Sequence, residues 1–271
     1  QWKGHEVLAE KDTPIQRITL VKTGSIFSAY SNGKISFSWP DREGAENEVH
    51  WAMLLHKNPR RVLVTSGACG GVLAEILKYK PVEDITYMEP DPLALPLFSE
   101  FLDPADAAAL NSDKVEVINE DIRMHIKNAR NLEYDVVIIR QDEPSSAQSN
   151  RVYTVEFFNE MSRIMRHNGI LALSLPGTEN YFSRASAEMN KSVHSSLKSV
   201  FGSVGVIPGQ PVVYLASNSR IPDTLGGFMS ARLKNEYSMN KPGNIFIVPK
   251  LMDFRLDAER IISFMSVMEK Y

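Results

Sequence analysis

The sequence contains a single cysteine, Cys69, among its 271 residues, and it contains no apolar run long enough to cross a bilayer. One cysteine excludes an intrachain disulfide and leaves no cysteine cluster for a zinc site, which indicates a reducing compartment and a cytoplasmic location. A membrane-spanning helix needs about 20 apolar residues, and the first residues lack the pattern of a signal peptide. Because the chain begins at Gln1 rather than Met, we also consider it as a piece of a longer protein.

The sequence also lacks a strong excess of either charge, since its formal net charge is −3. Proteins that bind nucleic acids normally carry a basic face or stripe, and no such stripe is visible here, so we expect no nucleic-acid partner. The six histidines show no metal-ligand spacing. His50 and His56 are interpreted as surface or capping groups of a helix, and we expect no metal.

Turn signals and hydrophobic patterning divide the chain into three predicted parts. Residues 15–39 contain short β-rich runs, and the Asn32-Gly33 pair between two of them predicts a hairpin. From residue 61 onward, apolar strands and amphipathic helices alternate, and the last ~50 residues are rich in helical patterns. The predicted parts are an N-terminal β-hairpin domain (1–56), a Rossmann-like nucleoside-binding domain (57–217) and a C-terminal helical appendage (218–271).

The alternation of strands and helices predicts an α/β fold with a doubly wound, mostly parallel sheet and a small N-terminal antiparallel β-domain. Near-continuous apolar strands indicate parallel pairing, right-handed crossovers and helices on both faces. Thr154 is the predicted N-cap of one helix, and His167-Asn168-Gly169 is its predicted stop. In such a sheet, ligands bind beyond the carboxyl ends of the strands, where the strand order reverses.

The first strand of the alternating region ends in SGACGG, residues 66–71. Glycines permit a tight turn and a close approach of the backbone to a ligand at a helix N-terminus, which makes Gly67 and Gly70 candidate binding residues. A tight strand-to-helix turn would need one glycine in any case. The dinucleotide fingerprint G-x-G-x-x-G does not fit, because Cys69 and Val72 occupy glycine positions, and this disfavours NAD.

The next two strands end in acidic residues. Glu89 follows the second strand roughly twenty residues after the glycine turn, a position from which an acid accepts hydrogen bonds from ribose hydroxyls. Asp121 opens the helix after the third strand, where it is either an N-cap or a partner for an adenine amino group, with Ile122 packing on the ring. Together, these strand ends predict a nucleoside site.

The fourth strand, VVIIRQDEP, places Arg140, Asp142 and Glu143 directly after a buried run of apolar residues. Charge at the end of a buried strand marks either a solvated exit loop or a site. The residues themselves leave these two alternatives open.

The succession RVLVTSGACGGVLAEILKYKPVEDITYMEPDP, VEVINEDIR and YDVVIIRQDEPSSAQSNRVYTVEFF resembles the spermidine synthase (polyamine aminopropyltransferase) family. The resemblance is closest to the domains of this kind that follow a membrane region in many bacterial proteins, and it implies, as an alternative location, the soluble domain of a membrane-associated protein. It implies a Rossmann-like fold of the class I methyltransferase type, binding of decarboxylated S-adenosylmethionine, a small polyamine acceptor and a homodimer. In the reaction that it implies, an amine attacks the methylene carbon beside the sulfonium, and methylthioadenosine leaves.

The chain departs from the family pattern where amines are handled. The resemblance places the family's base at Arg140, which stays protonated and cannot act as one. The acid that holds the cofactor's amine falls on Cys69, which is otherwise interpreted as a small residue that fills a turn. The family's Tyr-His-Glu motif keeps only its acid, Glu46. The positions that would bind the nucleoside keep the residues of the family pattern.

Three hypotheses follow. In the first, the chain is an aminopropyltransferase-like enzyme in which Asp142 or Glu143 is the base and Tyr153 orders the acceptor. In the second, Arg140 pairs with a carboxylate, that of S-adenosylmethionine or of an anionic acceptor, as in a methyltransferase. In the third, the chain binds a nucleoside or a partner without catalysis, and Arg140 forms a structural ion pair with Glu89 or Asp142.

Overall fold

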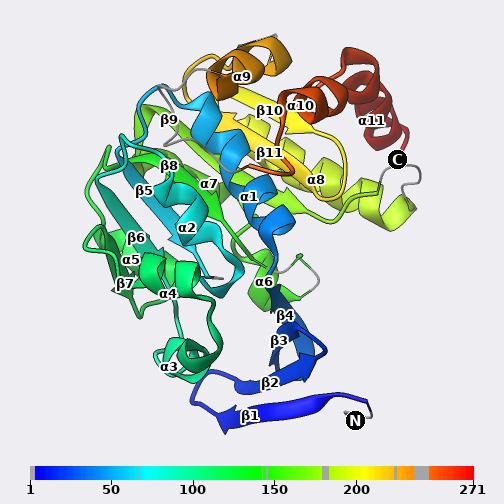
Figure 1. The fold of residues 1–271 in the computed structure, drawn as a ribbon. Helices are drawn as coiled ribbons and strands as arrows, with labels where there is room; N and C mark the ends of the chain where they lie inside the picture. The colour runs from blue at the N-terminus through cyan, green and yellow to red at the C-terminus, as the bar shows by residue number, and fades with distance from the viewer. Residues whose placement is uncertain are drawn as a thin grey trace.

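The computed structural model describes residues 4–66, 68–141, 143–144, 146–178, 183–222, 225–234 and 244–271. The described residues form two sheets, one of four strands near the N-terminus and one of seven strands with helices on both faces (Figure 1). The order in the larger sheet is β10-β11-β9-β8-β5-β6-β7. The predicted α/β fold class is confirmed.

The larger sheet is parallel from β9 to β7, and β11 and β10 complete it as antiparallel strands. The chain runs outward through β5, β6 and β7 and then returns to place β8 on the other side of β5. The strand order therefore reverses between β5 and β8, and this is the point at which a doubly wound sheet binds ligands. The strands are β5 (Arg61–Thr65), β6 (Asp84–Met88), β7 (Val115–Ile118), β8 (Tyr134–Ile139), β9 (Met165–Leu175), β10 (Ser203–Ile207) and β11 (Val212–Ser217).

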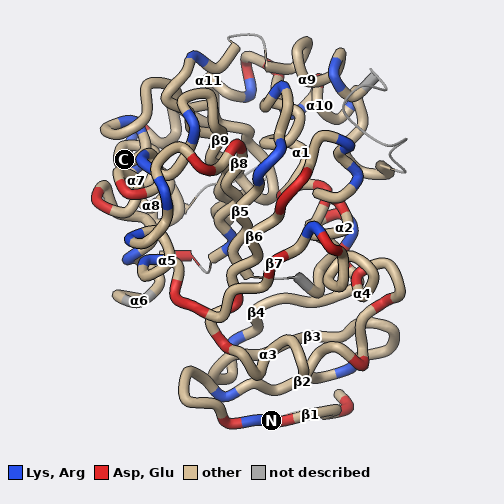
Figure 2. The backbone as a smooth tube through the Cα atoms, turned by 90° about the vertical axis from the view of Figure 1, so that its left-hand side faces the viewer, with Lys and Arg blue, Asp and Glu red and all other residues tan. Residues whose placement is uncertain are grey.

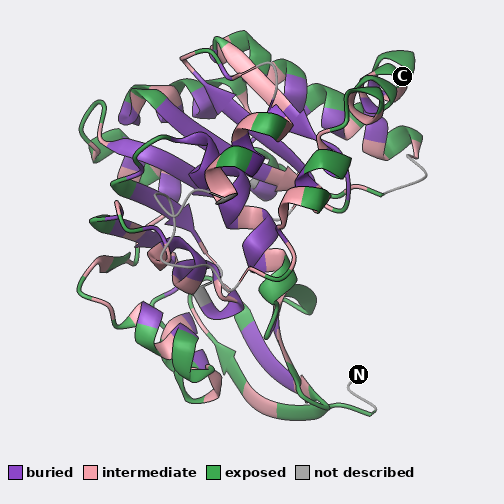
Figure 3. Ribbon diagram, turned by 45° about the horizontal axis from the view of Figure 1, so that its top comes forward, coloured by how far each residue is buried: buried purple, intermediate pink, exposed green. Residues whose placement is uncertain are grey.

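Two hydrophobic clusters cover the two faces of this sheet, and its strands are largely buried (Figure 3). Every residue of β8 is buried, as expected for a strand that is covered on both sides. One cluster draws on α1 (Arg42–Leu55), α2 (Val72–Leu77) and α4 (Pro104–Leu110). The other draws on α5 (Ile122–Asn128), α7 (Val155–Ile164) and α8 (Arg184–Val200). Shorter helical segments are η1 (Ala68–Gly70), α3 (Ala94–Phe98), η2 (Ser99–Phe101) and α6 (Ala147–Asn150).

The N-terminal sheet is antiparallel, in the order β1-β2-β3-β4. Asn32 and Gly33 form the two-residue turn between β3 and β4, with φ values of 50° and 82°, so the predicted Asn-Gly hairpin is confirmed. A third core cluster, which includes Trp39, Phe98 and Cys69, joins this sheet to α3 and to the glycine turn after β5. The strands are β1 (Glu6–Asp12), β2 (Arg17–Thr23), β3 (Ile26–Ser31) and β4 (Lys34–Trp39).

The predicted start of α7 is confirmed, and its predicted stop is wrong. The Thr154 hydroxyl accepts a hydrogen bond from the backbone N–H of Phe157 at 3.3 Å. The helix ends at Ile164, however, and Gly169 lies inside β9. A Cβ at Gly169 would lie 2.9 Å from a backbone oxygen of Arg166, where the pairing of β9 with β8 is irregular. Glycine is needed there for a close backbone approach within a strand rather than for a helix end.

The interpretation of His50 as a surface group is wrong, because its side chain is completely buried. Its ring nitrogens lie 2.8 Å from the Tyr79 hydroxyl and 3.0 Å from a Glu75 carboxylate oxygen. Burial lowers the pKa of His50, although the nearby Glu75 opposes the shift. His56 is the C-cap residue of α1, as a capping group would be, but it is also buried.

The C-terminal helices are tied to α1 by two buried charged residues. The Glu46 carboxylate accepts backbone hydrogen bonds from Ile245, Phe246 and Ile247 at 3.0, 2.9 and 2.8 Å. The Arg255 guanidinium donates to Asn47 Oδ1 at 2.6 Å and to backbone oxygens of residues 208 and 211. Glu46, which the resemblance assigns to an amine-handling motif, therefore binds the chain's own backbone. The helices are α9 (Leu225–Lys234), α10 (Pro249–Arg255) and α11 (Ala258–Lys270).

Replacement of Glu46 by alanine is expected to destabilise the protein strongly. It would leave three backbone N–H groups without their acceptor at a site where the native side chain is completely buried. The Ile247 donor is buried and the other two are part-buried, and a buried donor that loses a charged acceptor costs roughly 1–3 kcal/mol, so we expect a loss on the order of 3 kcal/mol. Chemical denaturation with urea measures this loss as a lower midpoint.

The matched control is Glu43→Ala, which removes an exposed carboxylate from the first turn of the same helix. This control is expected to shift the midpoint only slightly, because an exposed acid near a helix N-terminus contributes about 0.3–1 kcal/mol. Equal midpoints for the two variants would show that the contact between Glu46 and residues 245–247 does not hold the C-terminal helices in place.

Candidate functional site

The glycine turn after β5 is shaped by two residues with positive φ. Ser66 has a φ of 47° and Gly71, the N-cap residue of α2, has a φ of 89°. A Cβ at Gly71 would lie 3.3 Å from the Cβ of Ala45 on α1, so the turn needs glycine both for its backbone and for its packing. Gly70 lies between them in η1, whereas the predicted residue Gly67 lies outside the described residues.

Cys69 is buried in this turn, with a side chain that is 1% exposed and that packs in the cluster containing Trp39 and Phe98. Burial raises the pKa of its thiol to about 12, and the negative charges of Asp106 and Glu89 add to this rise. The thiol therefore stays neutral at physiological pH, and a neutral thiol offers no charge to an ammonium group. Its proposed contact with a cofactor stays a prediction.

Glu89 lies directly after β6, and the residue is only 9% exposed. One carboxylate oxygen accepts the Tyr87 hydroxyl at 3.2 Å, and the other accepts the backbone N–H of Asp91 at 3.2 Å. Each carboxylate oxygen can accept a further hydrogen bond, so the group retains capacity for two more donors. Burial raises the pKa of Glu89 to about 7, although these two hydrogen bonds oppose the rise.

The ends of β5, β6 and β7 are held together by backbone and side-chain hydrogen bonds. The Ser66 N–H donates to Met88 O at 2.8 Å, and the Glu89 N–H donates to Ile118 O at 3.0 Å. The Asn119 side-chain amide donates to Glu89 O at 2.8 Å. The three strand ends that the sequence predicted to converge are therefore adjacent. We call the carboxyl ends of β5 to β8 the strand-tip site.

Asp91 connects the strand-tip site to the N-terminal sheet. One of its carboxylate oxygens accepts the Thr13 hydroxyl at 2.8 Å and the Gln16 side-chain amide at 3.1 Å. Both donors belong to the turn between β1 and β2, and Asp91 itself is 1% exposed. Since Asp91 also donates its N–H to Glu89, the β1–β2 turn helps to fix Glu89. Sequence reasoning missed Thr13 and Gln16, which lie more than seventy residues from their partner.

Asp121 is the N-cap residue of α5, which was one of the two roles predicted for it. One carboxylate oxygen accepts the backbone N–H of Arg123 at 3.0 Å, and the other forms an ion pair with Arg151. A ligand that used this carboxylate would have to share it with these two donors. Ile122 is buried, with the residue 4% exposed. Binding of adenine by Asp121 and Ile122 stays a prediction.

Arg140 follows β8, and its backbone is fixed to the end of β5. Its N–H donates to the Thr65 hydroxyl at 2.8 Å, and its carbonyl accepts the hydroxyls of Thr65 and Ser66 at 3.0 and 3.1 Å. Its guanidinium donates to Ser66 O at 3.2 Å and forms an ion pair with Glu48 of α1. Among the described residues, Glu48 is the carboxylate that forms an ion pair with Arg140, and sequence reasoning missed it; Asp142, one of the two predicted partners, lies outside the described residues.

The remaining predicted catalytic residues lie along the segment after Arg140. Tyr153 is buried, and its hydroxyl donates to the backbone oxygen of Gln141 at 3.3 Å, which ties it to the strand-tip site. Glu143 is part-buried in this segment, and Asp142 lies outside the described residues. The roles of Asp142, Glu143 and Tyr153 stay predictions.

Asp106 of α4 is a further acid beside the glycine turn that sequence reasoning missed. Its carboxylate lies 3.7 Å from the position that a Cβ at Gly71 would take, and it is 5% exposed. Burial raises the pKa of Asp106 to about 7, with smaller contributions from the charges of Asp103 and Glu75. The charges of Asp106 and Glu89 raise the pKa of the Cys69 thiol, whereas that of Arg140 lowers it.

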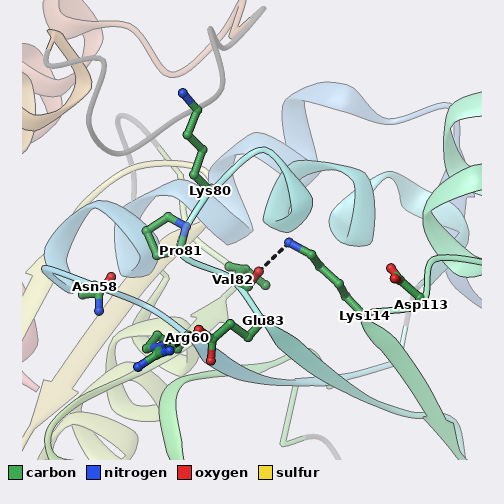
Figure 4. A pocket seen from close by; sticks show the side chains of 8 residues that line it. All are labelled: Asn58, Arg60, Lys80, Pro81, Val82, Glu83, Asp113 and Lys114. Carbon is green, nitrogen blue, oxygen red and sulfur yellow. Dashed lines mark hydrogen bonds and ion pairs between the residues drawn. The ribbon is translucent and has the colours of Figure 1, made fainter.

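A surface hollow of about 550 Å³ lies at the opposite, amino edge of the sheet (Figure 4). Its lining contains an ion pair between Arg60 and Glu83 and a hydrogen bond of 2.7 Å from Lys114 to Val82 O. The predicted site residues are not among those that line it. Since ligands of doubly wound sheets bind at the carboxyl edge, we assign this hollow no role in the site.

The distribution of charge over the described elements is mixed, with basic and acidic positions interspersed along both sheets and their helices (Figure 2). Within the described part of the chain, no His, Cys, Asp and Glu side chains group in a way that could hold a metal ion. Among the same residues, no helix combines the length and the apolar character that crossing a bilayer requires.

Comparison with known proteins gives a consistent result. A family model described as "Spermine/spermidine synthase domain" matches residues 45–213. The polyamine aminopropyltransferase of Leptospira interrogans is 33% identical over 184 residues, which are 67% of this chain and 36% of that protein. That of Sulfurisphaera tokodaii is 28% identical over 211 residues, 75% of this chain and 67% of that protein. The match to the Leptospira protein thus spans about a third of that relative's length.

Solved structures share the fold at low sequence identity. A spermidine synthase crystallised with the transition-state analogue AdoDATO superposes with a TM-score of 0.81 at 18% identity, covering 98% of this chain and 89% of that one. The spermidine synthase of Thermotoga maritima gives a TM-score of 0.78 at 19% identity, covering 98% of this chain and 88% of that one. Because the sequence identity is this low, the structural similarity shows that the fold, with its two sheets, is shared and shows nothing beyond the fold.

The raised pKa of Glu89 makes a specific prediction for the pH dependence of stability. A folded pKa of about 7, above the ordinary value of 4.5, means that the folded state keeps a proton that the unfolded state releases. As pH rises from about 4.5 to 7, the wild type should therefore lose free energy of unfolding relative to Glu89→Gln, on the order of 3 kcal/mol in all. Above pH 7, the difference in free energy of unfolding between the two proteins should stay constant. Denaturation of both proteins at several pH values measures it.

The comparison between wild type and variant cancels the contribution of Asp106, because both proteins retain that group. Glu43→Gln, which changes an exposed acid of α1, is the control and should give a curve parallel to that of the wild type. A Glu89→Gln curve that was also parallel to the wild type would contradict a buried carboxylate at the end of β6.

Proposed function

The chain is a member of the spermine/spermidine synthase family, and from this premise we propose that its strand-tip site binds an adenosyl sulfonium and transfers an aminopropyl-type group to a small amine. The donor would be decarboxylated S-adenosylmethionine or its carboxylated parent. The acceptor would be a polyamine or another small amine, because the relatives named above are polyamine aminopropyltransferases.

The observation that carries this proposal is the position of Glu89. Its buried carboxylate follows β6 beside the glycine turn, next to the point where strand order reverses. Neighbouring groups supply one donor to each of its oxygens, so both hydroxyls of a ribose could donate to the remaining lone pairs. In doubly wound folds, an acid in this position binds a ribose.

The chemistry of the transfer defines what the other residues would contribute. The lone pair of the acceptor amine forms a bond to the methylene carbon beside sulfur, the carbon–sulfur bond breaks with both electrons on sulfur, and neutral methylthioadenosine leaves. An alkylammonium has no lone pair, so a carboxylate must first accept its proton. Arg140 stays protonated, and we therefore assign the base to Glu143 or Asp142 and the ordering of the acceptor to Tyr153.

Arg140 favours a second candidate function, methyl transfer from S-adenosylmethionine. A guanidinium matches the geometry of a carboxylate, and the methyl donor carries one that the decarboxylated cofactor lacks. Binding without catalysis is the third candidate, and the ion pair of Arg140 with Glu48 would then serve only to join α1 to the strand ends. A homodimer and attachment to a membrane region in a longer chain, both implied by resemblance, stay predictions.

Turnover assays test the proposed base. The protein is incubated with each adenosyl sulfonium and with putrescine or spermidine, and released methylthioadenosine is measured by chromatography. The rate is expected to fall by about 10²–10⁴-fold in Glu143→Gln or in Asp142→Asn, whichever residue accepts the proton, because general base catalysis contributes a factor of that size. Tyr153→Phe, which removes the hydroxyl bonded to Gln141 O, should raise the KM for the amine.

Glu188→Gln provides the control, because this acid lies in an exposed ion pair on α8. Its rate should equal that of the wild type. Full activity in both Glu143→Gln and Asp142→Asn would refute the assignment of the base. Release of S-adenosylhomocysteine instead of methylthioadenosine would select methyl transfer, and the absence of both products with retained nucleoside binding would select the third candidate.

A further inference from the structure

The ion pair between Arg140 and Glu48 brings two opposite charges together at the strand-tip site. Arg140 follows β8, Glu48 lies on α1, and the guanidinium Nε contacts a carboxylate oxygen of Glu48. The two side chains are 16% and 22% exposed, so the pair is largely shielded but still reaches solvent. Charges in such surroundings interact more strongly than on an open surface, and each needs a partner of opposite sign.

The guanidinium is aimed over the glycine turn. Its NH1 group donates to Ser66 O at 3.2 Å, and its NH2 group lies 3.8 Å from the position that a Cβ at Gly70 would occupy. The backbone of Arg140 is held on both sides by the Thr65 hydroxyl, which donates to its carbonyl and accepts from its N–H. The guanidinium therefore lies beside the glycine turn. This turn is where we propose that the adenosyl sulfonium binds.

The carboxylate of Glu48 is the complementary part of the pair. Burial raises the pKa of Glu48, while the charge and hydrogen bonding of Arg140 lower it, so the ionised form depends on its cation. An incoming ammonium group could take the place of that cation. Cys69, where the resemblance implies an acid for the cofactor's amine, is buried and neutral, so Glu48 offers the negative charge that Cys69 lacks.

We infer that Glu48 and Arg140 together recognise an α-amino-acid head group, Glu48 binding its ammonium and Arg140 its carboxylate. The adenosyl sulfonium that carries this head group is intact S-adenosylmethionine. The exchange keeps every charge paired, because the ligand's two charges replace the two that the residues offer each other in the free protein. A decarboxylated donor would bring its ammonium beside Arg140 without a carboxylate to offset the repulsion.

This inference rests on the proposed function and narrows its donor. Attack at the same methylene carbon would then transfer a 3-amino-3-carboxypropyl group. The acceptor nitrogen forms a bond to that carbon, the carbon–sulfur bond breaks with its electron pair on sulfur, and the proton lost by the amine passes to the carboxylate that acts as base. Methylthioadenosine leaves as in aminopropyl transfer, but the product amine now carries the carboxylate of the transferred group.

Calorimetric titration with four ligands tests the inference. S-adenosylhomocysteine and methylthioadenosine both have a neutral sulfur and differ in the presence of the amino-acid head. S-adenosylmethionine and its decarboxylated form both have a sulfonium and differ in the carboxylate. Hydrogen bonds to charged groups contribute about ten- to a hundredfold in affinity, so we expect S-adenosylhomocysteine to bind at least about tenfold more tightly than methylthioadenosine.

The variants give each charge a separate readout. Arg140→Gln should weaken S-adenosylmethionine and S-adenosylhomocysteine by roughly tenfold or more, while the affinity for the decarboxylated donor stays equal or rises. Glu48→Gln should weaken all three ligands that carry an ammonium. Neither variant should change the affinity for methylthioadenosine. Arg166→Gln, which breaks an ion pair with Asp135 at the other edge of the sheet, is the control and should change none of the four.

If Arg140→Gln fails to fold because it isolates Glu48, the double variant with Glu48→Gln removes both charges and should bind methylthioadenosine with no added affinity for the amino-acid head. Equal affinity of the wild type for S-adenosylhomocysteine and methylthioadenosine would overturn this inference and leave the proposed function standing. Failure of all four ligands to bind at millimolar concentration would overturn both. In turnover with S-adenosylmethionine, mass spectrometry should detect a product amine that has gained a carboxylate.

Discussion

The hydrogen bonds between the end of β5 and the backbone of Arg140 are the constraint on which the site depends. They join β5 to β8 at the place where the sheet changes direction, since Thr65 and Ser66 bind both polar groups of the Arg140 backbone. A backbone held on both sides leaves the side chain at position 140 little choice of direction. From this backbone, the Arg140 side chain reaches Ser66 O and the vicinity of Gly70, so its charge becomes a property of the site.

A second set of bonds makes the site depend on the N-terminal sheet. Asp91 binds Thr13 and Gln16 through its carboxylate and Glu89 through its N–H, so the β1–β2 turn and the end of β6 form one connected group. The buried cluster of Trp39, Phe98 and Cys69 joins the same two parts through apolar contacts. The N-terminal sheet therefore belongs to the architecture of the site, because displacement of its first turn would release the backbone that orients Glu89.

The sequence predicted the fold because its signals are local. Alternating strands and helices, the Asn32-Gly33 turn and the Thr154 cap each depend on neighbouring residues, and the structure contains all of them. Gly169 was misread because a glycine required by a strand irregularity looks like a helix stop. The acids after β6 and β7 could be predicted to lie together, because the carboxyl ends of neighbouring parallel strands meet at one edge of the sheet. Glu48, the partner of Arg140 after β8, and Gln16, a partner of Asp91 after β6, could not be predicted, because tertiary packing alone brings them there.

The identity of the charges at the strand ends also limits which ligands the site can hold. With an acid at position 140 and another at position 69, as the resemblance implies, the site would attract cationic amines. In this chain, position 69 is neutral and position 140 is cationic, and Glu48 restores one negative charge from a different element. A largely buried cation and anion in contact exert little net field on a distant charge but a strong one on a dipolar group that meets both. A zwitterion gains from such a pair, whereas a lone ammonium gains from one member and is repelled by the other. A carboxylate on α1 in place of one at a strand end would therefore favour a zwitterionic ligand over a lone ammonium, as we propose, without a change in the fold around it.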